Sequence, residues 1–443
     1  MPKITFLGAG SAVFAKNVLG DVMTREPLKD AHVALYDIDR QRLNDSKRML
    51  ENLNANINDG RAKITAHLGV KSRKTALRKA DYVVNAIQVG GYEPCTVTDF
   101  EIPKKYGLRQ TIADTLGIGG IFRGLRTIPV MLEIARDIEE VCPEAWMLNY
   151  TNPMAIVTGA MLRGSNVKTV GLCHSVQVCA PHLLKHLDIE TSKLQWKIAG
   201  INHQAWLLEV TDDGKDLYPE IKKRAEKKNR KARKDGAEKH GDMVRFEMMR
   251  RFGYYITESS EHGAEYVPWF IKDRCPELIE EFNIPLDEYP RRCVKQIEKW
   301  KQVRKDLVEN TKLTHERTHE YGSGIIEAME TDVPFRIGGN VMNTGLIENL
   351  PREAVVEVPC LVDRNGVQGC WVGNLPEPCA ALNRTNINPQ LLTIEAALTL
   401  RKDRIYQAAL LDPHTSAELT IDETVSLCDD LLEAHKDWLP EYR

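Results

Sequence analysis

The sequence predicts an α/β protein that begins with a Rossmann-like, doubly wound parallel sheet. Apolar runs typical of buried strands recur through the first half, at residues 4–7, 32–37 and 81–87. Glycines follow the first and third of these runs, and helical patterns separate the strands, as in βαβ units. The pattern then changes to antiparallel strands and helices. A chain of 443 residues is too long for one simple core, so we expect two domains, at 1–200 and 201–443.

The first strand, turn, helix and second strand carry the features of a dinucleotide site. Ile4–Leu7 leads into Gly8, Gly10 and Ser11, a helical pattern follows, and the second strand ends in Asp37. Glycines let backbone N–H groups approach a pyrophosphate at a helix N-terminus, and the acid can hold a ribose diol. The third glycine of the usual pattern is absent, so a glycine-rich turn without a ligand is the alternative. Asp37 disfavours a 2′-phosphate, because two anions would meet there, and therefore favours NAD over NADP.

Two further segments of the first half carry polar residues that suit ligand binding. Residues 111–120 are polar and glycine-rich, contain Asp114, and precede a helix expected at about 121–141. They indicate a second cradle for an anion or a sugar, or alternatively a capped loop. The strand 146–150 is followed by Asn152, which either caps the next helix or offers its amide to a sugar hydroxyl.

A cysteine and a histidine end two more apolar runs. Thr169–Leu172 leads to Cys173 and His174, and Gly200–Asn202 leads to His203. A thiolate and an imidazole that end two strands can share one metal ion. The alternative is that Cys173 is a small buried hydrophobe.

The second half mixes strands with helices. Strands are expected at 205–210, 333–342 and 355–362, and helices within 277–330, at 394–411 and at 421–435. The basic run 221–240 lacks interleaved aromatic residues, which indicates a solvated helix or loop rather than a nucleic-acid site. The stretch 253–269 concentrates Tyr, Glu and His residues, which indicates a functional loop. A helix cap at Thr257 or Ser259 is the alternative.

Composition excludes several classes of protein. The net charge is −3, so no overall field favours nucleic acid or an acidic membrane surface. The N-terminus begins a strand at once, and no apolar run is long enough to span a bilayer. Ten cysteines occur without CxxC spacing and are expected as reduced thiols. We therefore expect a cytoplasmic protein with neither a nucleic-acid nor a membrane partner.

Taken together, these segments resemble the family 4 glycoside hydrolases, and within that family the melibiase-type α-galactosidases. The resemblance covers the whole chain. It is carried by the segments Gly8–Ser11, Gly90–Cys95, Ala113–Gly117, Asn149–Met154, Cys173–Gln177, Ile201–His203, Glu258–His262 and Asp412–Thr415. The NAD-dependent enzymes of this family are exceptions to the usual two-carboxylate mechanism of glycoside hydrolysis.

The resemblance implies a C-terminal α+β domain similar to that of lactate and malate dehydrogenases. It also implies bound NAD, a divalent metal (typically Mn²⁺), a homodimer or homotetramer, and a small α-galactoside as substrate. In the implied mechanism, NAD⁺ takes a hydride from C3 of the sugar, and the resulting ketone acidifies the C2 proton. A base removes that proton, the aglycone leaves from C1, water adds, and NADH reduces C3 again.

The resemblance also assigns residues to the metal and the sugar. Cys173 and His203 match the metal ligands of the family, and two protein ligands leave positions for water and for the C2 and C3 oxygens. Asn152 matches a substrate-binding residue, and Asp114 is also expected to bind the substrate.

The acid and the base are less closely defined by the resemblance. His174 follows the metal cysteine where phospho-sugar enzymes carry an Asp, and an imidazole can act as general acid near neutral pH. The C2 base is expected between Tyr255 and His262. Tyr255 is favoured there, and Glu258, Glu261 and His262 remain open.

Three other functions compete with α-galactoside hydrolysis. The nearest is hydrolysis of an α-glucoside or an α-galacturonide by the same mechanism. A plain NAD-dependent dehydrogenase of sugars or hydroxy acids would keep the fold but would give the Cys173 and His203 pair no task. A non-catalytic nucleotide-binding module would need only Gly8, Gly10 and Asp37.

Overall fold

A computed structural model describes residues 1–234 and 236–443 of the chain. Its N-terminal half is built on six parallel strands: β1 (Lys3–Leu7), β2 (His32–Asp37), β3 (Lys63–Leu68), β4 (Tyr82–Asn85), β5 (Trp146–Asn149) and β6 (Lys168–Gly171). They stand in the order β6-β5-β4-β1-β2-β3, and every neighbouring pair is parallel. This is the strand order of a doubly wound dinucleotide-binding sheet, in which ligands bind where the order reverses, here between β1 and β4.

The strands of this half are apolar because helices cover both faces of the sheet. The helices of this half are α1 (Ala12–Met23), α2 (Arg40–Asn58), α3 (Arg73–Leu77), α4 (Val97–Lys105), α5 (Gly117–Val141), α6 (Met154–Gly164) and α7 (Ser175–His186). Short irregular helices η1 (Glu26–Leu28), η2 (Val70–Ser72) and η3 (Gly91–Thr96) connect some of them. The helix expected at about 121–141 is α5, which begins four residues earlier than that, at Gly117.

The sheet continues beyond β6 with antiparallel strands. These are β7 (Leu194–Ile201), β8 (Gln204–Asp212), β9 (Lys215–Asp216), β10 (Tyr255–Ile256), β11 (Phe335–Met342), β12 (Val355–Asp363) and β13 (Gly366–Gly369). Within residues 1–234 and 236–443 all of them join β1–β6 in one 13-stranded sheet, in which β11 and β12 lie between β6 and β7. Because the sheet passes through residue 200, the domain boundary expected there stays a prediction.

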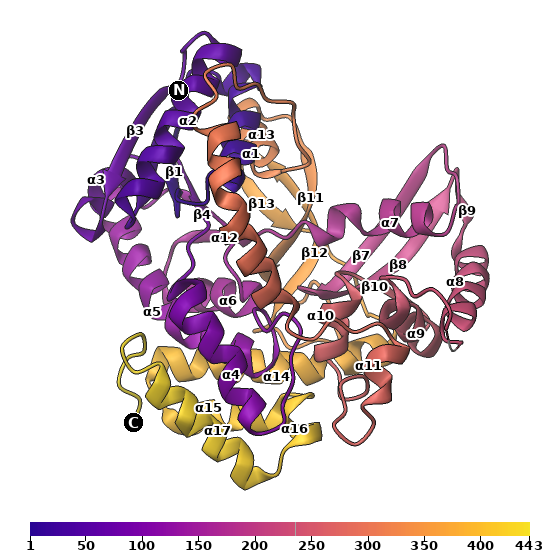
Figure 1. Ribbon diagram of the computed structural model, residues 1–443. Coiled ribbons are helices and arrows are strands. Elements are labelled where there is room, and N and C mark those ends of the chain that lie inside the picture. The colour runs from indigo at the N-terminus through magenta and orange to yellow at the C-terminus, as the bar shows by residue number, and fades with distance from the viewer. Residues whose placement is uncertain (235) are drawn as a thin grey trace.

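Helices of the second half pack against the antiparallel strands and against helices of the first half. They are α8 (Tyr218–Ala232), α9 (Met243–Phe252), α10 (Ser260–Glu265), α11 (Glu277–Glu281), α12 (Glu288–Leu307), α13 (Gly322–Thr331), α14 (Glu377–Thr399), α15 (Lys402–Leu411), α16 (Thr415–Glu418) and α17 (Ile421–Ala434). Figure 1 shows α14, α15 and α17 at the same end of the molecule as α4 and α5, and α14 packs against α5 and α6. The C-terminal helices therefore support the N-terminal half of the chain.

Three expectations about the second half need correction or completion. The single helix expected at 394–411 is two helices, because Leu400 takes a left-handed φ of 58° between α14 and α15. The helical stretch within 277–330 is three separate helices. Most of the basic run 221–240 lies in or just after α8, whose Lys and Arg side chains are largely exposed, as expected for a solvated helix; residue 235 of that run lies outside the described residues. Among the described helices, none is long and apolar enough to cross a membrane.

Candidate active site

Three potential metal ligands converge beside the carboxyl end of β6. They are Cys173, His203 and Glu258, whose ligand atoms all lie within 4.8 Å of one another. Cys173 lies two residues past the end of β6, His203 lies in the tight turn between β7 and β8, and Glu258 follows β10. The structure therefore brings together the cysteine and histidine expected as ligands and adds a carboxylate to them.

Three non-glycine residues in or near this cluster have left-handed backbone. His203 has φ 63° and Glu258 has φ 64°, and Ala113, which precedes Asp114, has φ 53°. Left-handed backbone costs a non-glycine residue about 1 kcal/mol or more, and such residues gather at functional sites. The strain is therefore one reason to regard these three segments as one site.

The contacts of His203 show which of its two ring nitrogens faces the cluster. Its Nδ1 lies 3.0 Å from Oη of the buried Tyr266, and its Nε2 lies 3.5 Å from Oε2 of Glu258. When Nδ1 carries the proton and donates to Tyr266, the lone pair of Nε2 is directed at Glu258. An outer partner that fixes the tautomer in this way is typical of metal-ligating histidines.

Cys173 is held as a thiol as long as no cation is near. Burial raises the pKa of Cys173, and the carboxylates of Glu357 and Glu258 raise it further. Its Sγ lies 3.2 Å from Oγ of Ser175. A divalent cation would reverse this preference, because a coordinating thiol loses its proton. Thiolate, imidazole and carboxylate together suit a divalent metal, and three protein ligands leave positions for water or sugar oxygens.

The expected substrate residues lie next to the metal cluster. Asn152 donates its Nδ2 hydrogen to Oδ2 of Asp114 over 3.2 Å, and Nε2 of His262 lies 4.0 Å from Oδ1 of Asp114. The ring of His262 packs edge-on against that of His203, with 4.8 Å between the centroids. Asn152 is not a helix cap, since α6 begins only at Met154 and Pro153 takes the cap position.

His174 directly follows Cys173 and lies beside Tyr321, the residue that precedes α13. Its Nε2 lies 2.6 Å from Oε2 of Glu320, and about half of its side chain is exposed. The hydrogen bond with Glu320 raises the pKa of His174. Its ring lies 5.9 Å from that of Tyr150, which follows β5. An exposed imidazole that keeps its proton to higher pH suits a general acid.

Tyr255, the favoured candidate for the base, is not brought to the cluster. Its side chain is completely buried, and its hydroxyl donates a hydrogen bond to Oδ1 of Asp242 over 3.0 Å. Burial raises the pKa of Tyr255 well above its usual range. A hydroxyl enclosed in this way cannot reach a sugar, which corrects the preference for Tyr255 and leaves Glu258, Glu261 and His262. Of these, Glu261 is paired with Arg292, 2.7 Å away.

The nucleotide loop has the shape that the sequence predicts. Gly8 has φ 84°, and a Cβ atom there would lie 2.6 Å from the carbonyl oxygen of Ala86 on the neighbouring segment. The backbone N–H of Gly10 donates to Oδ2 of Asp37 over 2.6 Å, and Ser11 immediately precedes α1. The turn follows β1 at the point where the strand order reverses between β1 and β4, which is where doubly wound sheets bind their ligands.

One buried carboxylate near the site was missed in the sequence. Glu265, on α10, accepts hydrogen bonds from the backbone N–H groups of Thr111 (2.8 Å) and Ala113 (2.9 Å). Burial raises the pKa of Glu265 to about 7. The residue ties the loop that ends in Asp114 to the helix that carries His262. It lies within the stretch 253–269, but nothing in its local sequence indicates the distant loop that it holds.

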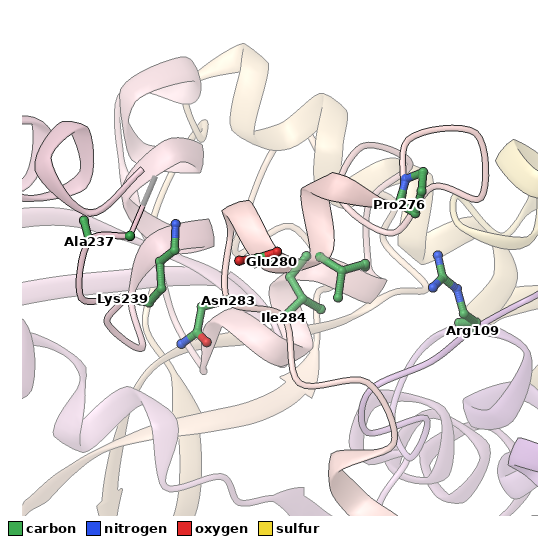
Figure 2. Close-up of a pocket in the computed structure, with 9 residues that line it drawn as sticks. Arg109, Ala237, Lys239, Pro276, Glu280, Asn283 and Ile284 are labelled. Atoms are coloured by element: carbon green, nitrogen blue, oxygen red, sulfur yellow. The ribbon is translucent and has the colours of Figure 1, made fainter. Parts of the chain in front are cut away.

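A surface hollow elsewhere in the molecule takes no part in this site. Figure 2 shows Arg109, Lys239 and Glu280 among the residues that line it, together with segments around α11. None of the candidate site residues lines this hollow.

Comparison with known proteins decides the family. The sequence model described as "Family 4 glycosyl hydrolase" matches residues 3–189, and that of the "Family 4 glycosyl hydrolase C-terminal domain" matches residues 198–415. An α-galactosidase of Bacillus subtilis (strain 168) is 64% identical over 443 residues, which is 100% of both chains. The chain belongs to glycoside hydrolase family 4.

Solved structures confirm the fold class expected for this family 4 chain. A 6-phospho-α-glucosidase from gut microorganisms, solved in complex with NAD and Mn²⁺, covers 100% of both chains with a TM-score of 0.79 at 21% identity. The lactate dehydrogenase of Cryptosporidium parvum covers 89% of this chain and 98% of its own, with a TM-score of 0.52 at 14% identity. The Rossmann-like sheet and its likeness to lactate dehydrogenase are thus both confirmed.

Proposed function

We propose that this family 4 enzyme is an NAD- and divalent-metal-dependent α-galactosidase that breaks the glycosidic bond by oxidation at C3, deprotonation at C2 and elimination of the aglycone from C1. The observation that carries the proposal is the convergence of Cys173, His203 and Glu258 at the carboxyl edge of a dinucleotide-binding sheet. The identity of 64% with an α-galactosidase of Bacillus subtilis over the full length supports the choice of sugar.

The cofactors would supply chemistry that no side chain offers. Bound NAD provides a hydride acceptor and donor, and a cation, for which we propose Mn²⁺, provides a Lewis acid at the C2 and C3 oxygens. Gly8, Gly10, Ser11 and Asp37 would hold the nucleotide. Both groups are present in the 6-phospho-α-glucosidase structure described above, whose fold this chain shares.

The site residues divide the remaining work. Cys173 and His203, with Glu258 as a third ligand, would hold the cation. Asp114 and Asn152 already form a hydrogen-bonded pair, which would hold sugar hydroxyls in a fixed orientation beside the cation.

Proton transfer falls to two histidines, His262 and His174. Burial lowers the pKa of His262, so its imidazole is neutral and able to accept the C2 proton. Glu258 is the alternative base if it does not ligate the metal. His174, whose pKa the carboxylate of Glu320 raises, would donate a proton to the leaving oxygen at C1.

Aryl α-glycosides test the proposal directly. The purified enzyme would be assayed with NAD⁺, Mn²⁺ and a thiol reductant on aryl α-galactoside, α-glucoside and α-galacturonide. We expect the α-galactoside to be hydrolysed fastest, without lasting NADH absorbance, and a chelator to abolish the activity. NADH formed in proportion to substrate would instead show a dehydrogenase, and a faster reaction with either of the other sugars would overturn the assigned substrate.

A further inference from the structure

A row of four residues crosses the sheet between the strands that carry Cys173 and His203. Gly171 of β6 pairs with Asn340 of β11, Asn340 with Glu357 of β12, and Glu357 with Gly200 of β7. Cys173 follows Gly171 by two residues, and His203 follows Gly200 by three. The spacing of the two ligands therefore depends on two strands, β11 and β12, that contribute no ligand themselves.

Side-chain hydrogen bonds reinforce this row. Nδ2 of Asn340 donates to the carbonyl oxygen of Gly171 (3.3 Å) and to Oε1 of Glu357 (2.9 Å). Oε1 of Glu357 also accepts from Nδ2 of Asn202 over 3.3 Å, and Asn202 immediately precedes His203. All three side chains are buried. One carboxylate thus links the backbone next to Cys173 with the turn that carries His203.

Three buried side-chain oxygens in this row and next to it lack a hydrogen-bond donor. Oε2 of Glu357, Oδ1 of Asn340 and Oδ1 of Asn202 have no hydrogen-bond partner. Within the part of the chain that the structure describes, Glu357 forms no ion pair with a lysine or arginine. A buried carboxylate without a counter-charge is costly. A cation held by Cys173 and His203 would be its counter-charge.

We propose that Glu357 is a positioning residue of the metal site, which fixes the distance between the strands of Cys173 and His203 and compensates the charge of the bound cation. The inference rests on the metal site proposed above. Outer residues of this kind typically contribute about 10- to 100-fold to metal affinity.

Metal affinity, measured apart from activity, tests this role. The full-length wild-type protein and Glu357→Gln would be titrated with Mn²⁺, and free Mn²⁺ would be followed by electron paramagnetic resonance. We expect the dissociation constant to rise by about 10- to 100-fold in Glu357→Gln, with NAD affinity unchanged. Glu247→Gln is the matched control: Glu247 is also a buried carboxylate, but it pairs with Arg250 and Arg251 on its own helix α9. Its Mn²⁺ affinity should equal that of the wild type.

The outcomes separate this inference from the proposed function. If the wild type itself does not bind Mn²⁺, the proposed function fails. If the wild type binds and Glu357→Gln binds as tightly, only the role of Glu357 is overturned. Should Glu357→Gln not fold, Asn340→Ala would be titrated instead, because it removes the donor between Gly171 and Glu357 but keeps the charge. Weaker Mn²⁺ binding by Asn340→Ala supports the role, and unchanged binding contradicts it.

Discussion

His203 and Glu258 face each other across 3.5 Å, Nε2 to Oε2, and both hold a left-handed backbone that non-glycine residues rarely adopt. They come from two turns that are 55 positions apart in the sequence. With Cys173 they form a group of three potential metal ligands, of which the sequence predicts Cys173 and His203. The proposed activity depends on that arrangement, and each of the following changes tests one part of it.

Replacement of Cys173 by Ser should remove activity without removing the nucleotide site. As a thiolate, Cys173 is the softest ligand of the cluster. The Gly8–Ser11 turn belongs to another segment of the chain, immediately before α1. We expect kcat/KM to fall by about 100-fold or more, while NAD affinity, measured by calorimetry, stays close to that of the wild type. A variant that keeps full activity would show that no metal acts at this position.

Glu258→Gln tests whether the carboxylate belongs to the metal site. The change keeps the shape but removes the charge, so we expect Mn²⁺ affinity and kcat/KM to fall together, each by about 10-fold or more. Glu261→Gln, three residues further on, alters a carboxylate that pairs with Arg292 instead and should bind Mn²⁺ normally. If Glu258→Gln loses activity with normal Mn²⁺ binding, Glu258 is the base and not a ligand.

Glu320→Gln should change the pH profile through His174. The carboxylate of Glu320 stabilises the imidazolium and so raises the pKa of His174. Its removal lowers that pKa, and the general acid then loses its proton at lower pH. The alkaline limb of kcat/KM should therefore move to lower pH, with the acid limb unchanged. A profile that does not move would assign the acid to another residue.

Glu265→Gln should change how stability depends on pH. Burial raises the pKa of Glu265 from 4.5 to about 7, so folding favours the neutral form. The stability that this gives is complete below about pH 4.5 and is lost as pH rises through about 7. The metal-free wild type should therefore lose more free energy of unfolding than Glu265→Gln over this window, as urea titrations at several pH values would show. Parallel curves for the two proteins would contradict a raised pKa. The variant should also lower kcat, because the loop that ends in Asp114 is held less firmly.

Local pattern was enough to predict much of the fold. The glycine turn at Gly8, the acid at Asp37 and the apolar runs that end at Cys173 and His203 are features of single segments, and each lies where the sequence places it. The break at Leu400 escaped prediction, because a leucine in left-handed conformation gives no signal in an apolar helical pattern.

The parts of the site that escaped prediction depend on long-range pairing. Glu357 and Asn202 are 155 positions apart and meet only because β12 inserts between β11 and β7. Tyr255 lies in the stretch that is expected to hold the base. Its strand has only two residues, so the alternation of apolar and polar residues is too short to show that the side chain is buried. The partners of Glu265 likewise lie about 150 positions away.

In the proposed mechanism the glycosidic bond breaks after a proton has left C2, and isotopes at C2 test this order most directly. Hydrolysis of an aryl α-galactoside in deuterated water, with NAD⁺ and Mn²⁺ present, should place deuterium at C2 of the galactose product, and deuterium at C2 of the substrate should slow turnover. An active enzyme that shows neither effect would contradict the account.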